Sequence, residues 1–171
     1  GQRTIFNILG PLTNPAGANI QLTGVFDPKL TEPLAHVLNE LGSKAALVIH
    51  GANGLDELNT TGANRVSHLK NNSVETYDLN PADLNLAPST IQDLRGGAPD
   101  ESAEMMKAIL SNQLQGARRD AVLLNAAAAL AAESGDFKSA LDEARASLDS
   151  GNALNKLNAL IEFTRQFQTI Q

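Results

Sequence analysis

Two neighbouring acidic residues, Asp56 and Glu57, follow the glycine-containing segment 50–54 (HGANG). Consecutive side chains point to opposite faces of a strand and about 100° apart on a helix, so only an irregular turn aims both carboxylates at one spot. Gly51 and Gly54 give the backbone that freedom. Such a pair can hold Mg²⁺ together with water and a substrate phosphate. The alternative is a solvated pair of turn carboxylates, because acidic residues are common in loops.

A second candidate binding site lies near the start of the sequence, where Arg3 precedes Gly10 and Pro11. A guanidinium binds a carboxylate through two parallel hydrogen bonds, and a Gly-Pro backbone leaves room for a flat ligand. The alternative is an arginine on a fraying terminal helix. Arg118 and Arg119 have a similar pair of interpretations: a phosphate site, or a helix start with local ion pairs.

The motifs of common catalytic machinery do not occur: there is no G-x-S-x-G, no P-loop, no H-E-x-x-H and no G-x-G-x-x-G. His36, His50 and His68 lack metal-ligand spacing, and we expect His36 on the surface of an amphipathic helix. His50, at a strand end beside a glycine loop, is the histidine best placed for a function. Asn125 and Asn158 are candidates for buried polar contacts.

The composition excludes several classes of protein. With 13 basic and 19 acidic residues the net charge is −6, and without a Lys/Arg cluster we expect no nucleic-acid partner. The absence of cysteine excludes disulfides, thiol catalysis and cysteine-ligated zinc. No apolar run approaches the roughly 18 residues that span a membrane, and there is no signal-peptide pattern. We therefore expect a cytoplasmic protein with no membrane partner.

The first half of the sequence has the pattern of an α/β protein. We expect a short helix at 3–9, a strand at 20–26, and a helix that begins at Asp27 and ends before Gly42. The continuous apolar run at 45–49 is typical of a parallel strand covered on both faces. Strand, helix and strand in this order predict a βαβ unit with a right-handed crossover.

The second half changes to helical periodicity. A hairpin is predicted from strands at 65–70 and 74–79, followed by a proline-marked connector at 81–88. Four helices follow, at 99–114, 119–133, 137–149 and 152–167. The sequence thus predicts an α/β fold, a partial parallel-sheet domain with a helical carboxyl-terminal part.

Several segments resemble one enzyme family. Residues 3–15 (RTIFNILGPLTNP) are similar to the R-T-I-F-N-L-L-G-P-L-T-N-P signature of the anthranilate phosphoribosyltransferases, and residues 50–57 (HGANGLDE) to their H-G-x-x-G-L-D-E stretch. Residues 94–97 (LRGG) and 119–127 (RDAVLLNAA) also look like segments of this family. The likeness runs from end to end, and the sequence resembles the carboxyl-terminal half of that enzyme.

This resemblance implies a phosphoribosyltransferase fold of the nucleoside phosphorylase-like type, and a full-length homodimer. It implies Mg²⁺-dependent attack of the anthranilate amine on C1 of phosphoribosyl pyrophosphate, with release of pyrophosphate, in tryptophan biosynthesis. Arg3 takes the position of the arginine that contacts anthranilate, and Gly10 and Pro11 line the same pocket. Asp56 and Glu57 take the positions that hold Mg²⁺ on the pyrophosphate. No catalytic acid or base is implied among these residues.

The sequence departs from the family in what it lacks. The G-T-G-G-D phosphate loop and the K-H-G-N segment do not occur, nor does the helical amino-terminal domain, and Asn53 stands where an acidic residue is frequent. We expect residues 1–171 to be one α/β domain of a larger phosphoribosyltransferase, with no useful turnover alone. A nucleic-acid-binding relative and a pyrimidine-nucleoside phosphorylase relative are the alternatives, disfavoured by the acidic balance and by the motif at 3–15.

Overall fold

The computed structural model describes residue 10 and residues 12–167, so the helix predicted at 3–9 lies outside the described residues. Four strands form one sheet in sequential order: β1 (Ile20–Gly24), β2 (Ala45–His50), β3 (Asn64–Lys70) and β4 (Ser73–Leu79). β1 and β2 are parallel, whereas β2–β3 and β3–β4 are antiparallel. The predicted parallel pair and hairpin are therefore confirmed, within a mixed sheet.

One face of the sheet is covered by α2 (Thr31–Glu40), which follows the single-turn helix η1 (Pro28–Leu30). Asp27 caps the start of η1, where its carboxylate accepts the N–H of Lys29 at 2.9 Å. The apolar stripe of α2 packs on the sheet through Leu34 and Leu38. Gly42 has a φ of +85° just beyond the helix, the left-handed conformation that glycine adopts at low cost.

The opposite face is covered by α4 (Ala117–Ala131) and α5 (Phe137–Asp149). The side chains of β2 alternate between the two faces of the sheet. Leu47 and Ile49 pack towards α4 and α5, and Ala46 and Val48 pack towards α2. Its first five residues are all buried, as the continuous apolar run predicted. Burying each large aliphatic side chain contributes about 1.5–3 kcal/mol, so this strand is the centre of the hydrophobic core.

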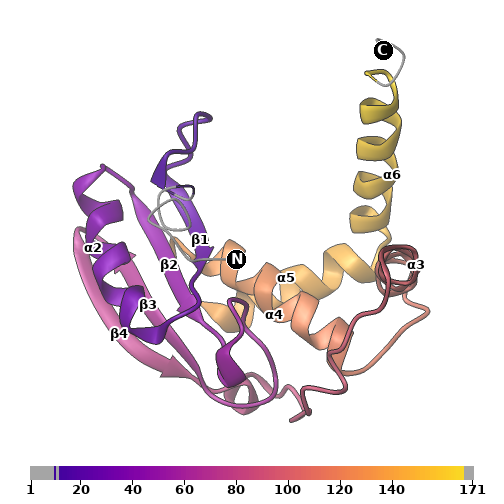
Figure 1. Cartoon of the computed structure of the whole chain (residues 1–171), viewed down its shortest axis with the longest axis horizontal. Coiled ribbons are helices and arrows are strands. Elements are labelled where there is room, and N and C mark those ends of the chain that lie inside the picture. Colours follow the sequence, from indigo (N-terminus) through magenta and orange to yellow (C-terminus); the bar gives the residue numbers. More distant parts are fainter. Residues whose placement is uncertain (1–9, 11, 168–171) are drawn as a thin grey trace.

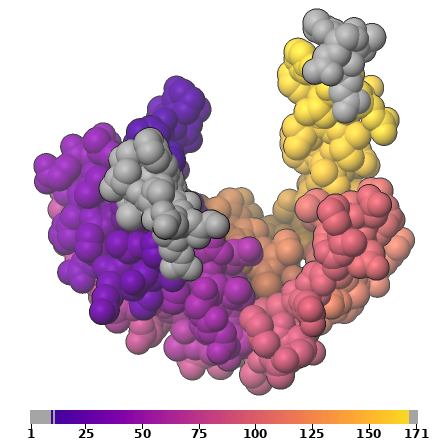
Figure 2. Space-filling view, viewed as in Figure 1, coloured from indigo at the N-terminus to yellow at the C-terminus, as the bar shows by residue number. Residues whose placement is uncertain are grey.

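The remaining helices form a second arm of the molecule. These are α3 (Pro99–Leu110) and α6 (Asn152–Arg165), whereas the single-turn helix η3 (Pro81–Leu84) follows β4 and packs Leu84 into the core shared with α4 and α5. Figure 1 shows a U-shaped arrangement, with the sheet and α2 in one arm, α4 and α5 across the base, and α3 and α6 opposite. The space-filling view has a broad hollow between the arms (Figure 2). Among the described residues, no helix is both long and apolar enough to span a membrane.

Candidate functional site

The two predicted metal ligands lie in the acidic loop, residues 51–63, which joins β2 to β3. This loop begins with the 3-10 turn η2 (Ala52–Gly54), in which Asn53 and Gly54 have φ values of +59° and +81°. Both acidic side chains, Asp56 and Glu57, are exposed. Among the described residues, neither carboxylate forms a hydrogen bond or an ion pair. The pair thus lies on an irregular turn, as its spacing predicted, with its oxygens free to bind a ligand.

Two glycines allow the acidic loop to approach the ends of the parallel strands. A Cβ on Gly24, the last residue of β1, would lie 1.7 Å from the carbonyl oxygen of Asp56. A Cβ on Gly51 would lie 1.8 Å from the carbonyl oxygen of Glu57. Neither distance is possible for a side chain, so the backbone of both acidic residues is packed directly on glycine. The conformational freedom predicted for Gly51 and Gly54 is used at Gly54, with a φ of +81°, and not at Gly51, whose φ is −76°. Sequence analysis missed the close approach at both Gly51 and Gly24.

Two buried asparagines, Asn59 and Asn64, hold the acidic loop from inside. Oδ1 of Asn64 accepts the N–H groups of Asn59 and Ala52 at 2.9 and 3.2 Å, and its Nδ2 donates to the carbonyl of Asn59 at 3.0 Å. Nδ2 of Asn59 donates to the carbonyls of Ala52 and Glu57 at 3.0 and 3.3 Å. These side chains supply the hydrogen bonds that an irregular backbone cannot make to itself. Sequence analysis missed both, because no periodic pattern marks them.

A third asparagine reaches the loop from the helical part of the molecule. Oδ1 of Asn125 on α4 accepts the N–H of Leu58 at 3.0 Å, and its Nδ2 donates to the carbonyl of Leu58 at 2.7 Å. The prediction of a polar contact is confirmed for Asn125, which is half-buried. It is wrong for Asn158, which is exposed on α6, a helix with no buried residue.

The other predicted site adjoins the acidic loop at Gly24. A cavity of about 630 Å³ is lined by Gly10, by residues 13–15 and by residues 21–24 of β1. Gly24 therefore lies between this cavity and the backbone of Asp56. Arg3 and Pro11 lie outside the described residues. Of the predicted anthranilate-binding residues, only Gly10 is described.

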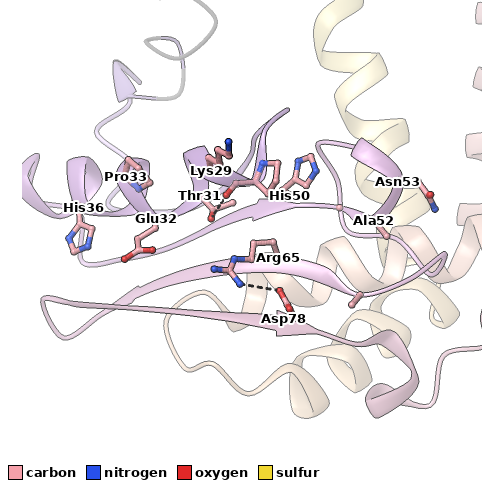
Figure 3. Close-up of a pocket in the computed structure, with 13 residues that line it drawn as sticks. Lys29, Thr31, Glu32, Pro33, His36, His50, Ala52, Asn53, Arg65 and Asp78 are labelled. Carbon is pink, nitrogen blue, oxygen red and sulfur yellow. Dashed lines mark hydrogen bonds and ion pairs between the residues drawn. The ribbon is translucent and has the colours of Figure 1, made fainter.

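His50 lines a different cavity, of about 810 Å³, between the start of α2, the end of β2 and the β3–β4 hairpin (Figure 3). Its Nδ1 lies 2.8 Å from the carbonyl oxygen of Val25. A carbonyl only accepts hydrogen bonds, so this contact requires the proton on Nδ1 and leaves Nε2 as an acceptor. Arg65 and Asp78 pair at 3.4 Å across the same cavity, which the acidic pair does not line.

The other two histidines singled out in the sequence, His36 and His68, differ in their burial. His36 is exposed, as predicted. His68 is buried, with Nε2 2.9 Å from the carbonyl oxygen of Ala132. These two histidines therefore lie on different faces of the sheet.

The two arginines at the start of α4 are bound within the protein. Arg118 donates to the carbonyl of Arg95 at 2.9 Å, and Arg119 pairs with Asp149 on α5 at 2.7 Å. The interpretation as a helix start with ion pairs is therefore the better one, although the partner comes from α5 and not from the neighbouring Asp120.

The donor set of the acidic loop fits a magnesium ion. No group of three or more His, Asp or Glu side chains gathers in the described part of the chain. Mg²⁺ prefers hard oxygen ligands and is commonly bound by one or two carboxylates, with water and substrate phosphate completing the octahedron. Asp56 and Glu57 supply two exposed, unpartnered carboxylates of this donor type on an anchored backbone.

Comparison with known proteins shows the family of this chain. Residues 1–154 match the family model described as "Glycosyl transferase family, a/b domain". The anthranilate phosphoribosyltransferase of Desulfatibacillum aliphaticivorans is 48% identical over 168 residues, 97% of this chain and 49% of the relative. That of Acetivibrio thermocellus is 47% identical over 171 residues, 98% of this chain and 49% of the relative. The chain thus spans about half the length of these curated relatives.

Solved structures with the same name have the same fold. The anthranilate phosphoribosyltransferase of Thermus thermophilus superimposes with a TM-score of 0.87 at 39% identity, over 96% of this chain and 49% of that one. The enzyme of Saccharomyces cerevisiae, solved in complex with PRPP and Mg, gives a TM-score of 0.81 at 28% identity, over 95% of this chain and 47% of that one.

Proposed function

The chain belongs to the glycosyl transferase family whose α/β domain it matches over residues 1–154, and from this we propose that it is part of an anthranilate phosphoribosyltransferase. The reaction joins the amine nitrogen of anthranilate to C1 of phosphoribosyl pyrophosphate. The bond from C1 to the pyrophosphate oxygen breaks, pyrophosphate leaves with the electron pair, and the amine loses a proton. Such a product serves tryptophan biosynthesis in the cytoplasm.

The observation that carries this proposal is the position of Gly24 between the two halves of the predicted site. On one side it lines the cavity that also contains Gly10, and on the other it contacts the backbone of Asp56. An acceptor bound beside Gly10 and Pro11 would therefore lie next to the acidic loop. We assign the carboxylate of anthranilate to Arg3, on the motif at residues 3–15.

We assign Asp56 and Glu57 to a Mg²⁺ ion on the pyrophosphate. When bound, this ion neutralises the charge that develops on the leaving group. An acidic chain with a net charge of −6 thus has a means to handle a polyanionic donor. The yeast relative was solved with PRPP and Mg and, in a separate structure, with 4-fluoroanthranilate, which supports both ligands for this chain.

This chemistry needs little from protein acids or bases. An aromatic amine is a nucleophile without prior deprotonation, so the main contribution of the residues is to hold donor and acceptor in line. Asp56 and Glu57 suit that role because their backbone is packed on glycine and their side chains are exposed. The resemblance further supports a homodimer for a protein of the relatives' full length.

A chimera tests the proposal. This chain replaces the matching half of the Acetivibrio thermocellus relative, to which it is 47% identical. We expect the folded chimera to consume anthranilate, followed by its fluorescence, only when Mg²⁺ and phosphoribosyl pyrophosphate are both present. The double variant Asp56→Asn with Glu57→Gln is the matched control and should be inactive. A chimera with native circular dichroism and no anthranilate consumption would overturn the assignment.

The 171-residue chain by itself provides the second arm of this test. We expect no useful turnover from it, because the family's phosphate loop is absent from its sequence. Readily measured turnover would contradict that expectation. Titration with single-stranded DNA separates the alternative of a nucleic-acid-binding relative, and we expect no binding.

A further inference from the structure

One side chain of α4 holds both backbone groups of a residue in the acidic loop. Asn125 accepts the N–H of Leu58 at 3.0 Å and donates to its carbonyl at 2.7 Å, across 67 residues of sequence. The second hydrogen of the same amide is donated to the carbonyl of Ala121, one helical turn back, at 2.9 Å. The amide plane of Asn125 is therefore fixed by its own helix and presents a matched donor and acceptor to the loop.

The position of this contact matters because the acidic side chains have no other support. The carboxylates of Asp56 and Glu57 have no hydrogen bond or ion pair within the described part of the chain, so only the backbone fixes the direction in which each side chain leaves it. Leu58 follows Glu57 directly, and its side chain is 0% exposed. The bonds from Asn125 thus fix the backbone at the first residue beyond the acidic pair, while Gly24 and Gly51 fix it at the pair itself.

The face of α4 that carries Asn125 is directed at the loop over two turns. Arg118, Ala121, Val122 and Asn125 are spaced i, i+3, i+4 and i+7, and all four line a cavity of about 500 Å³ that Glu57 also lines. The acidic loop therefore packs against a regular helix and not against another irregular segment. Second-sphere groups that orient a ligand are most effective on such an element.

We propose that Asn125 is a positioning residue for the metal-binding carboxylates, and that α4 sets the geometry of the acidic loop through it. This inference rests on the proposed function of Asp56 and Glu57 as Mg²⁺ ligands. It adds that ligand geometry depends on a helix of the carboxyl-terminal part, which carries no ligand itself. Loss of the Asn125 amide leaves both carboxylates in place but frees the backbone that aims them.

Paramagnetic NMR tests the inference on the 171-residue chain. Mn²⁺ replaces Mg²⁺, inorganic pyrophosphate supplies the phosphate oxygens, and the broadening of ¹⁵N-labelled backbone amides reports where the ion binds. In the unaltered chain we expect the amides of Gly24 and residues 55–58 to broaden first. In Asn125→Ala we expect the same broadening to need about tenfold more Mn²⁺, the lower end of the loss seen when second-sphere partners of metal ligands are removed.

Two further variants separate positioning from stability. Leu141→Val removes a buried methylene of α5 that lies outside the hydrogen bonds of Asn125 and outside the lining of the cavity shared by α4 and Glu57, so it weakens the fold while these bonds remain, and we expect Mn²⁺ broadening to be unchanged. Asn125→Asp keeps the acceptor for Leu58 N–H and loses the donor to its carbonyl. Its added negative charge would by itself attract the cation, so a lower affinity in this variant reports lost positioning. If Asn125→Ala does not fold, Asn125→Asp carries the test.

The outcomes distinguish the two proposals. Broadening at the loop of the unaltered chain, with an equal Mn²⁺ dependence in the folded Asn125 variants, would overturn the positioning role and leave the metal assignment standing. No broadening of the loop in the unaltered chain would overturn the metal assignment, and the positioning role with it. A weaker affinity in the Asn125 variants but not in Leu141→Val supports both.

Discussion

The acidic loop and α6 are opposite cases of how a segment is held in this protein. The loop, residues 51–63, has little regular structure, but Leu58 and Asn59 are 0% and 1% exposed. α6 is a regular helix of 14 residues with no buried residue, and Leu160 and Phe163 are each 56% exposed. Figure 1 shows α6 as the far arm of the U, attached near α3 and α5. The irregular segment is the better anchored of the two.

The difference follows from where backbone hydrogen bonds come from. A helix satisfies most of its N–H and C=O groups internally, so the backbone of α6 needs few hydrogen bonds from the rest of the chain. A loop must take these bonds from side chains or from other parts of the chain, and this loop takes them from its own Asn59, from Asn64 on β3 and from Asn125 on α4. The proposed ligands lie where the backbone has the most tertiary partners, which is the condition for a preorganised site.

The largest difference in stability is expected when a leucine is replaced by alanine in each of the two segments. Leu58→Ala should lower the free energy of unfolding by about 3 kcal/mol, the usual loss for a fully buried leucine. Leu160→Ala, on the exposed face of α6, should change it by less than about 0.5 kcal/mol. Urea denaturation followed by circular dichroism measures both. Equal losses would show that α6 is as well anchored as the loop.

A smaller effect is expected from adding one methyl group at the contact between β1 and the loop. Gly24→Ala places a Cβ 1.7 Å from the carbonyl oxygen of Asp56, so the loop must move, at a cost of about 1–3 kcal/mol. Gly96→Ala is the matched control, because its Cβ would lie at an ordinary 3.4 Å from Ser102. Thermal unfolding compares the two. An unaffected melting temperature in Gly24→Ala would mean that the loop is not held against β1.

The N-terminal cap of α5 is expected to stabilise the protein in a pH-dependent way, and the start of α6 is not. Asp136 caps α5, and the hydrogen bond from the backbone N–H of Ser139 to its carboxylate, at 3.0 Å, lowers the pKa of Asp136. The stabilisation is therefore complete above the unfolded-state pKa and is lost as the pH falls through the lowered, folded-state pKa. α6 begins at Gly151 without a side-chain cap and has no such dependence at its start.

Carboxyl NMR titration of Asp136 and acid unfolding of two variants check this contrast. Asp136→Ala removes the acceptor, and its melting temperature should fall slightly at neutral pH and converge with the unaltered chain in acid. Asp136→Asn keeps an acceptor oxygen without the titration, so this contribution to its stability should not vary with pH. An Asp136 that titrates at the ordinary value for aspartate would contradict the expectation.

The smallest effect on stability is expected at the proposed ligands themselves. Glu57→Gln removes a charge with no partner among the described residues, so the free energy of unfolding should change by less than about 0.5 kcal/mol. Binding of Mn²⁺ with pyrophosphate should weaken strongly in the same variant. Loss of stability without loss of metal binding would reverse the assignment of this residue from ligand to structural contact.

Most elements of the fold were predictable because local patterns encode them. The apolar run of β2, the turn at Asn71-Asn72 and the periodicity of α5 each specify an element from a few neighbouring residues. Boundaries differ by a few residues: the helix predicted at 99–114 ends at Leu110, and Asn112 just beyond it has a φ of +60°. Such a residue ends a helix as glycine does, but asparagine also occurs inside helices, so its identity alone does not predict the end.

The candidate site was predictable only in part, because local patterns in the sequence encode only some of its contacts. Asp56 and Glu57 were identifiable because adjacent acids after a glycine segment imply an irregular turn within a short window. Gly24 and Asn64 were missed because their partners are backbone atoms of the acidic loop, which leave no trace in residue type.

The sequence by itself determined that acidic side chains follow a buried strand on an irregular turn, since that outcome depends on steric freedom within a few residues. Only the tertiary structure decided that β1 ends in a glycine against that turn, and that an asparagine 67 residues away fixes its backbone. Those contacts depend on how the helices and strands pack, and packing brings together residues whose positions in the sequence carry no common pattern.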